Sequence, residues 1–146
     1  MIYLEWFTFP DSEKEFDFFL KQKRPCYDSY YPFQIFSRHH FRRIDFAPVT
    51  ILYGGNGSGK TTAINVIAEK MNLERDSVFN KSSFFGDYLD FCDYDTQIPV
   101  PKVSRIITSD DVFDYMLNIR SMNEGIDRKK EELFEDYLDV KYSHFR

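Results

Sequence analysis

Apolar side chains near the start of the chain fall into a strand pattern followed by a helix pattern. Residues 2–9 are rich in aromatic and β-branched types and end at Pro10, which predicts a strand. Ser12 with Glu15 three positions later matches a capping box, and apolar residues then recur at helical spacing. We therefore expect a helix over about 12–23, directly after the strand.

The next stretch has no clean period and gives way to two further strand patterns. Tyr, Pro and Phe crowd residues 25–36, which predicts an ordered loop, and we interpret residues 10–36 as an insertion between strands. We expect one strand near 41–46 and another over 49–53, where Pro48 fits just before the start. The second is a continuous apolar run, typical of a strand buried on both faces of a sheet.

After a glycine-rich turn the pattern becomes mainly helical. One helical face carries Ala63, Ile64, Ile67, Ala68 and Met71. Residues 103–108 form a candidate strand, and Val112 opens the pattern of a further helix that Gly125 is expected to end. A last amphipathic helix is expected over 127–146, continuing into a C-terminal part beyond it. Residues 73–100 give no clear prediction, and the whole pattern predicts an α/β fold.

Composition places the chain among globular proteins of one domain. It has 146 residues, of which 42% are hydrophobic and 18% aromatic, enough to bury a core. The formal net charge of −5 gives no general attraction to nucleic acid or to anionic membranes. The chain opens without the basic-then-apolar order of a secretion signal, and no apolar window is long enough to span a bilayer. Its two cysteines suggest no disulfide framework, so we expect a soluble cytoplasmic protein.

The strongest chemical signal is the glycine-rich loop between the 49–53 strand and the helix after it. The loop matches G-x-x-x-x-G-K-[ST] at every fixed position and consists of Gly54, Gly55, Asn56, Gly57, Ser58, Gly59, Lys60 and Thr61. Glycines let the backbone approach phosphates closely, so that successive N–H groups form an anion nest, which the dipole of the following helix reinforces. The loop therefore predicts binding of the phosphates of ATP.

Three side chains at the end of this loop have expected roles in phosphate chemistry. Lys60 would reach the β and γ phosphates and is the candidate catalytic residue. The hydroxyl of Thr61 would ligate Mg²⁺, and Thr62 would add a hydrogen bond to the α phosphate. The expected cofactors are therefore ATP and Mg²⁺.

The interior of the loop, Gly-x-Asn-Gly-Ser-Gly-Lys-Thr-Thr, resembles the ATP-binding cassette (ABC) superfamily. The run from Phe41 to Gly54 is similar to the start of SMC- and RecF-like soluble ATPases (AAA-family), in which a short strand and loop precede the phosphate-binding loop by this distance. The resemblance covers residues 36–71 well and the rest loosely. It implies a P-loop NTPase fold of the ABC-type ATPase head, which pairs head-to-tail as a homodimer around two ATP molecules. Such heads commonly serve DNA repair, chromosome handling or phage defence, so DNA is left open as a partner.

The same resemblance implies further site residues. In the family, the region before the loop's strand can contact the nucleotide, which gives this role to Arg42 and Arg43; an exposed strand end is the alternative. A Gln-bearing loop of the family contacts Mg²⁺, and Asp111 is the candidate at the equivalent place. A helix N-terminal cap by Ser109 or Asp110 explains the same stretch without a metal.

Other motifs of the resembling family do not follow in this sequence. Nowhere do four apolar residues precede Asp-Glu, and no Ser-Gly-Gly-like signature is found. We therefore expect the chain to be the N-terminal lobe of an ATPase that hydrolyses ATP when complete. Two alternatives stay open: a nucleotide-binding or interaction module that does not hydrolyse ATP, and a small P-loop phosphotransferase.

Overall fold

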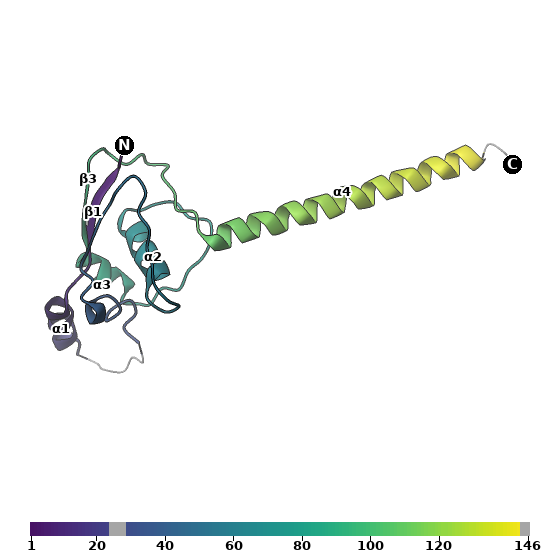
Figure 1. Cartoon of the computed structure of the whole chain (residues 1–146). Coiled ribbons are helices and arrows are strands. Elements are labelled where there is room, and N and C mark those ends of the chain that lie inside the picture. The colour runs from purple at the N-terminus through teal and green to yellow at the C-terminus, as the bar shows by residue number, and fades with distance from the viewer. Residues whose placement is uncertain (24–28, 144–146) are drawn as a thin grey trace. The chain divides into compact units, whose positions relative to one another are not determined.

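A computed structural model describes residues 1–23 and 29–143 (Figure 1). The chain divides into two units, Met1–Ile106 and Ile107–Arg146. The first unit contains, in chain order, β1 Leu4–Thr8, α1 Ser12–Lys21, the 3-10 helix η1 Ser37–His39, β2 Arg43–Asp45, α2 Lys60–Lys70, α3 Phe85–Asp90 and β3 Asp93–Thr96. The second unit contains α4 Ser109–Ser143. The described residues thus form a mixed α/β structure.

The strands of the first unit form an antiparallel sheet with β1 at its centre, in the order β2-β1-β3. Phe7 of β1 is opposite Ile44 of β2 and Tyr94 of β3. Successive side chains on a strand point to opposite faces, and Phe7 and Ile44 both belong to the buried core. The strands expected over 2–9 and near 41–46 are confirmed, each shorter than expected.

An aromatic cluster forms much of the core of the first unit. Phe18 of α1 stacks on Phe33 with 4.5 Å between ring centroids, and Phe33 meets Tyr88 of α3 edge-on at 4.9 Å. At these separations aromatic pairs attract one another beyond the gain from burial alone. Residues 10–36, which we interpret as an insertion, therefore supply part of the core; residues 24–28 of the expected loop lie outside the described residues.

Residues 49–53 belong to no strand of the sheet: the chain bends at Val49, and residues 50–53 have no regular secondary structure. Val49, Ile51 and Tyr53 are 79%, 81% and 98% exposed. The expectation of a strand buried on both faces is wrong, because β2, β1 and β3 pair with one another and, within the described ranges, leave residues 49–53 outside the sheet. The P-loop NTPase fold stays a prediction.

The start of α1 is capped by Asp11. Asp11 is extended, with φ −85° and ψ 175°, and its carboxylate accepts the N–H of Lys14 at 3.0 Å. This hydrogen bond lowers the pKa of the Asp11 carboxyl. The expected capping box of Ser12 and Glu15 is wrong, because Asp11 serves as the cap and the Glu15 side chain is buried in the protein.

The helix expected after the glycine-rich loop is confirmed as α2, but its buried face differs from the expected one. Ala63 and Ala68 are buried as predicted, and Val66 is completely buried. Ile64 is 41% exposed, so its expected place on the buried face is wrong. The buried stripe runs through Ala63 and Val66, and Ile64 lies about 100° around the helix from Ala63.

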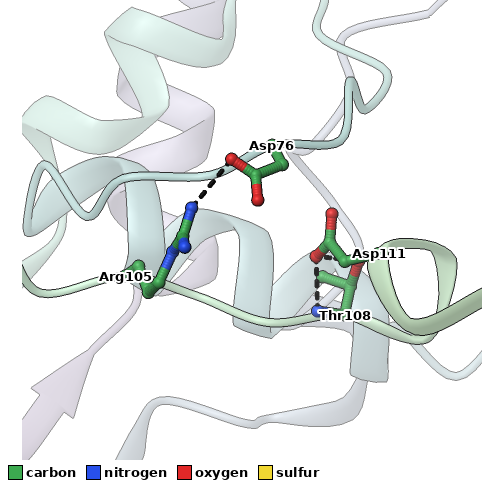
Figure 2. Close-up of polar contacts among 4 residues, drawn as sticks. All are labelled: Asp76, Arg105, Thr108 and Asp111. Carbon is green, nitrogen blue, oxygen red and sulfur yellow. Dashed lines mark hydrogen bonds and ion pairs between the residues drawn. The ribbon is translucent and has the colours of Figure 1, made fainter. Parts of the chain in front are cut away.

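The strand expected over 103–108 is reduced to a single bridge. Arg105 and Glu74 form an isolated parallel bridge, in which the Glu74 N–H donates to the Ser104 carbonyl at 2.9 Å. The Arg105 guanidinium also makes an ion pair with Asp76 at 2.8 Å (Figure 2). These contacts hold the segment that contains Arg105 beside residues 74–76 without extending the sheet.

The second unit is dominated by α4, a continuous helix of 35 residues in which no side chain is buried. The expected end at Gly125 is wrong, because one glycine costs about 1 kcal/mol in a helix interior and so long a helix tolerates it. The helix expected over 127–146 is the second half of α4, and residues 144–146 lie outside the described residues. Apolar residues recur along α4 every seven positions, at Val112, Ile119, Ile126, Leu133 and Val140.

None of the helices in the described part of the chain combines the length and the apolar character that crossing a bilayer requires.

Candidate functional site

Residues 54–62, which we name the phosphate loop, follow residues 49–53 and include the first three residues of α2. Gly57 and Gly59 have φ of 78° and 91°, in the left-handed region where a side chain is strained. Gly59 is also the N-cap residue of α2, and its carbonyl accepts the N–H of Ala63 at 2.8 Å. Gly57 and Gly59 therefore occupy the positions at which the backbone turns into the helix.

Gly59 lies so close to the preceding loop that a methyl group would not fit. An added Cβ would come within 2.7 Å of Ile35 Cγ2 and 3.1 Å of Phe36 Cε1. A Cβ at Gly54 would lie 2.5 Å from the hydroxyl oxygen of Ser58. The missing side chains at Gly54 and Gly59 thus let the phosphate loop pack against itself and against residues 35–36.

The ammonium group of Lys60 lies over the phosphate loop. Its Nζ donates to the carbonyl oxygens of Gly54 and Gly55 at 2.6 and 2.7 Å and to the hydroxyl of Ser58 at 3.3 Å. An ammonium group is a compact point charge with three donors, which suits it to anionic oxygens such as those of phosphate. The structure therefore brings the predicted lysine together with the backbone of the predicted loop.

Thr61 and Thr62 begin the first turn of α2. The Thr61 side chain is exposed, whereas the Thr62 hydroxyl accepts a hydrogen bond from the hydroxyl of Tyr31 at 3.1 Å. Tyr31 is a neighbour of the site that the sequence pattern missed, because the contact joins positions 31 residues apart. The expected contact of Thr62 with a phosphate stays a prediction.

A cavity of about 430 Å³ opens beside the phosphate loop. Its lining consists of Phe36, His39, Phe41, Ile51, Leu52, Tyr53, Ser58, Gly59, Lys60 and Ala63. The volume falls in the range of small-molecule sites, which are mostly apolar with a few polar groups. Aromatic rings next to a phosphate-binding loop can hold a planar group that is attached to a phosphate chain.

The two arginines expected to contact the nucleotide do not line this cavity. Arg43 forms an ion pair with Asp45 at 2.8 Å, and its guanidinium carbon lies 4.7 Å from the centre of the Trp6 ring. The backbone carbonyl of Arg42 accepts the N–H of Phe9 at 2.8 Å, and its side chain is exposed. A nucleotide contact by Arg42 or Arg43 stays a prediction.

Asp111 belongs to the second unit, where it takes part in the start of α4. One of its carboxylate oxygens accepts both the N–H and the hydroxyl of Thr108, at 2.6 and 2.8 Å (Figure 2). The Val112 N–H in turn donates to the Thr108 carbonyl at 3.2 Å, as expected when Thr108 is the N-cap. The capping group is thus Asp111 with Thr108 rather than Ser109 or Asp110, and a metal-binding role for Asp111 stays a prediction.

The described ranges hold no group of three or more His, Cys, Asp or Glu side chains that could bind a metal ion. The exposed hydroxyl of Thr61 is an oxygen ligand of the type that Mg²⁺ accepts together with substrate phosphates. A magnesium site that uses Thr61 would therefore form with the phosphates and not ahead of them.

Comparison of the chain with protein-family models, with curated proteins and with solved structures finds no match. The geometry of the site combines left-handed glycines, a helix N-terminus, a lysine ammonium group and an adjoining aromatic cavity. Chemically, the arrangement suits an anion joined to a planar apolar group.

Proposed function

We propose that this chain binds ATP, with Mg²⁺, through the phosphate loop. One observation carries the proposal: the complete G-x-x-x-x-G-K-T pattern stands directly before α2, with Gly57 and Gly59 in the left-handed region and Lys60 as the first helical residue. Left-handed glycines turn backbone N–H groups toward an anion, and the start of a helix adds free donors and a positive dipole end. Lys60 then supplies a full positive charge to the β and γ phosphates.

The adenine base would occupy the cavity beside the loop. Phe41, Tyr53 and His39 contribute planar rings to its lining, and Lys60 lines the same cavity. A nucleotide could therefore place its phosphates on the loop and its base among these rings at the same time. The hydroxyl of Thr61 would ligate the Mg²⁺ that accompanies the phosphates.

Calorimetric titration of the full chain with Mg·ATP tests the proposal. Lys60→Ala removes a charge-assisted contact of about 1.5–3 kcal/mol, so affinity should fall by about tenfold or more. Lys21→Ala removes the same charge from an exposed position on α1, outside the cavity lining, and should leave the affinity unchanged. Equal affinities for wild type and Lys60→Ala would refute the assignment of the loop.

Tripolyphosphate has no base, so its binding tests the contribution of the phosphate loop to affinity separately from that of the cavity. If the base is held among the aromatic rings, ATP should bind more tightly than tripolyphosphate, and Phe41→Ala should remove most of that difference. Binding of tripolyphosphate should be lost in Lys60→Ala and kept in Phe41→Ala. Equal affinity of wild type for the two ligands would limit the proposal to the phosphates.

A further inference from the structure

The first unit contains a buried carboxylate, that of Glu15. Glu15 of α1 is 2% exposed, and its two oxygens each lie 3.1 Å from the backbone N–H of Gln34. The hydroxyl of Ser37 donates to one of these oxygens at 2.6 Å. Burial raises the pKa of the Glu15 carboxyl, whereas the hydrogen bonds from Ser37 and Gln34 act in the opposite direction.

The two partners of this carboxylate stand on either side of Ile35 and Phe36. Gln34 has φ of 66°, a left-handed conformation that costs a residue with a side chain about 1–2 kcal/mol. Such a conformation persists only where surrounding contacts impose it, and the hydrogen bonds to Glu15 are contacts of this kind. The carboxylate therefore holds residues 34–37 at both ends.

Ile35 and Phe36 in turn pack against the phosphate loop. An added Cβ on Gly59 would lie 2.7 Å from Ile35 Cγ2 and 3.1 Å from Phe36 Cε1, so both side chains pack closely against the backbone at the N-cap of α2. Phe36 is 4% exposed and lines the cavity that Lys60 also lines. An unbroken series of contacts thus leads from Glu15 through residues 34–37 to Gly59.

We propose that Glu15 is a positioning residue of the phosphate loop. Its carboxylate fixes residues 34–37, and Ile35 and Phe36 fix Gly59 in the left-handed conformation that starts α2. Glu15 touches no ligand and acts through the shape of the loop. Its effect on affinity rests on the proposed ATP binding, whereas its effect on the conformation of the loop does not.

The test compares three variants of the full chain. Glu15→Gln keeps the size of the side chain but replaces an accepting oxygen with an NH₂ donor. Ser37→Ala removes the 2.6 Å hydrogen bond and leaves the two to Gln34. Cys92→Ala is the matched control, because it removes buried volume at the end of α3, where its thiol bonds to the Tyr88 carbonyl.

Two readouts are recorded under conditions in which each variant is folded. The first is the amide resonances of Gly57, Gly59 and Lys60 in ¹H–¹⁵N spectra, and the second is the Kd for Mg·ATP. Glu15→Gln should move these resonances and weaken ATP binding by about tenfold, and Ser37→Ala should do both to a smaller extent. Cys92→Ala should lower stability and change neither readout.

Unmoved loop resonances in a folded Glu15→Gln variant would overturn the proposal, and so would equal movement in Cys92→Ala. If Glu15→Gln does not fold, the Ser37→Ala spectrum decides on the same criterion. Failure of the wild type to bind ATP would refute the proposed function but not the positioning role of Glu15. The loop resonances would still show whether Glu15 positions Gly59.

Discussion

Substituting alanine for Gly55, Gly57 and Gly59 in turn tests how backbone conformation and packing stabilise the phosphate loop. At Gly55, no heavy atom lies within 4 Å of an added Cβ and φ is outside the left-handed region. At Gly57 the space is equally open, but φ is 78°. At Gly59 both problems are present, because φ is 91° and Ile35 Cγ2 would lie 2.7 Å from the new methyl group.

These differences set the expected losses in the free energy of unfolding. Gly55→Ala should be near neutral. Gly57→Ala should cost about 1–2 kcal/mol, the penalty of a left-handed conformation for a residue with a Cβ. Gly59→Ala should cost that penalty and a further 1–3 kcal/mol, roughly, for overpacking against Ile35 and Phe36, or about 2–5 kcal/mol in all.

Urea unfolding followed by tryptophan fluorescence measures all three losses. Trp6, the one tryptophan of the chain, lies in β1 and reports on the first unit. The slope of the free energy against urea should stay constant across the series, so that changes in midpoint are changes in stability. Equal losses for Gly57→Ala and Gly59→Ala would show that Ile35 and Phe36 do not confine the loop. A large loss for Gly55→Ala would contradict its open surroundings.

Three further substitutions or modifications test other features. Tyr88 is completely buried, and its hydroxyl has no hydrogen-bond partner among the described residues. Tyr88→Phe should therefore raise the free energy of unfolding by about 1 kcal/mol. A lower free energy of unfolding in urea would instead reveal a partner of the Tyr88 hydroxyl. Burial raises the pKa of the Cys92 thiol to about 12. In a Cys26→Ser variant, Cys92 should therefore stay protonated at pH 8 and react with a thiol reagent only after unfolding. Rapid labelling of the native protein would contradict this. Gly125→Ala should stabilise α4 by about 0.5–1 kcal/mol, because alanine favours a helix over glycine and an added Cβ meets no atom within 4 Å. The gain should appear as a larger helical circular dichroism signal at raised temperature. An unchanged signal would contradict this prediction.

Features set by neighbouring residues were the ones that the sequence predicted well. The start of α2 follows from Gly59 and Lys60, because the glycine permits the left-handed turn and the helix donors come next in the chain. β1 follows from its own aromatic and β-branched side chains. In both places the physical cause lies within a few residues of the element.

Features set by distant partners were missed. The segment Asp93–Thr96 has two aspartates and a weak preference for strand, yet it pairs with β1, 85 to 92 residues earlier, and becomes β3. Glu15 fits the local pattern of a capping box, but its hydrogen bonds go to residues 19 and 22 positions later. Ser58, Gly59 and Lys60 of the cavity lining were predicted, but Phe41 was missed for the same reason as Glu15, since the packing that places Phe41 and Lys60 around one cavity leaves no periodic signal in the sequence.

The seven-residue repeat on α4 has a geometric consequence. Seven residues of an α-helix turn through about 700°, which falls about 20° short of two full turns. Val112 and Val140 are four repeats apart, so the apolar line drifts by about 80° around the helix between them. The five apolar residues therefore follow a shallow left-handed spiral on the surface of α4. A straight partner helix could not contact all five of them. Only a surface that winds around α4 in the left-handed sense can follow these five residues along their whole length.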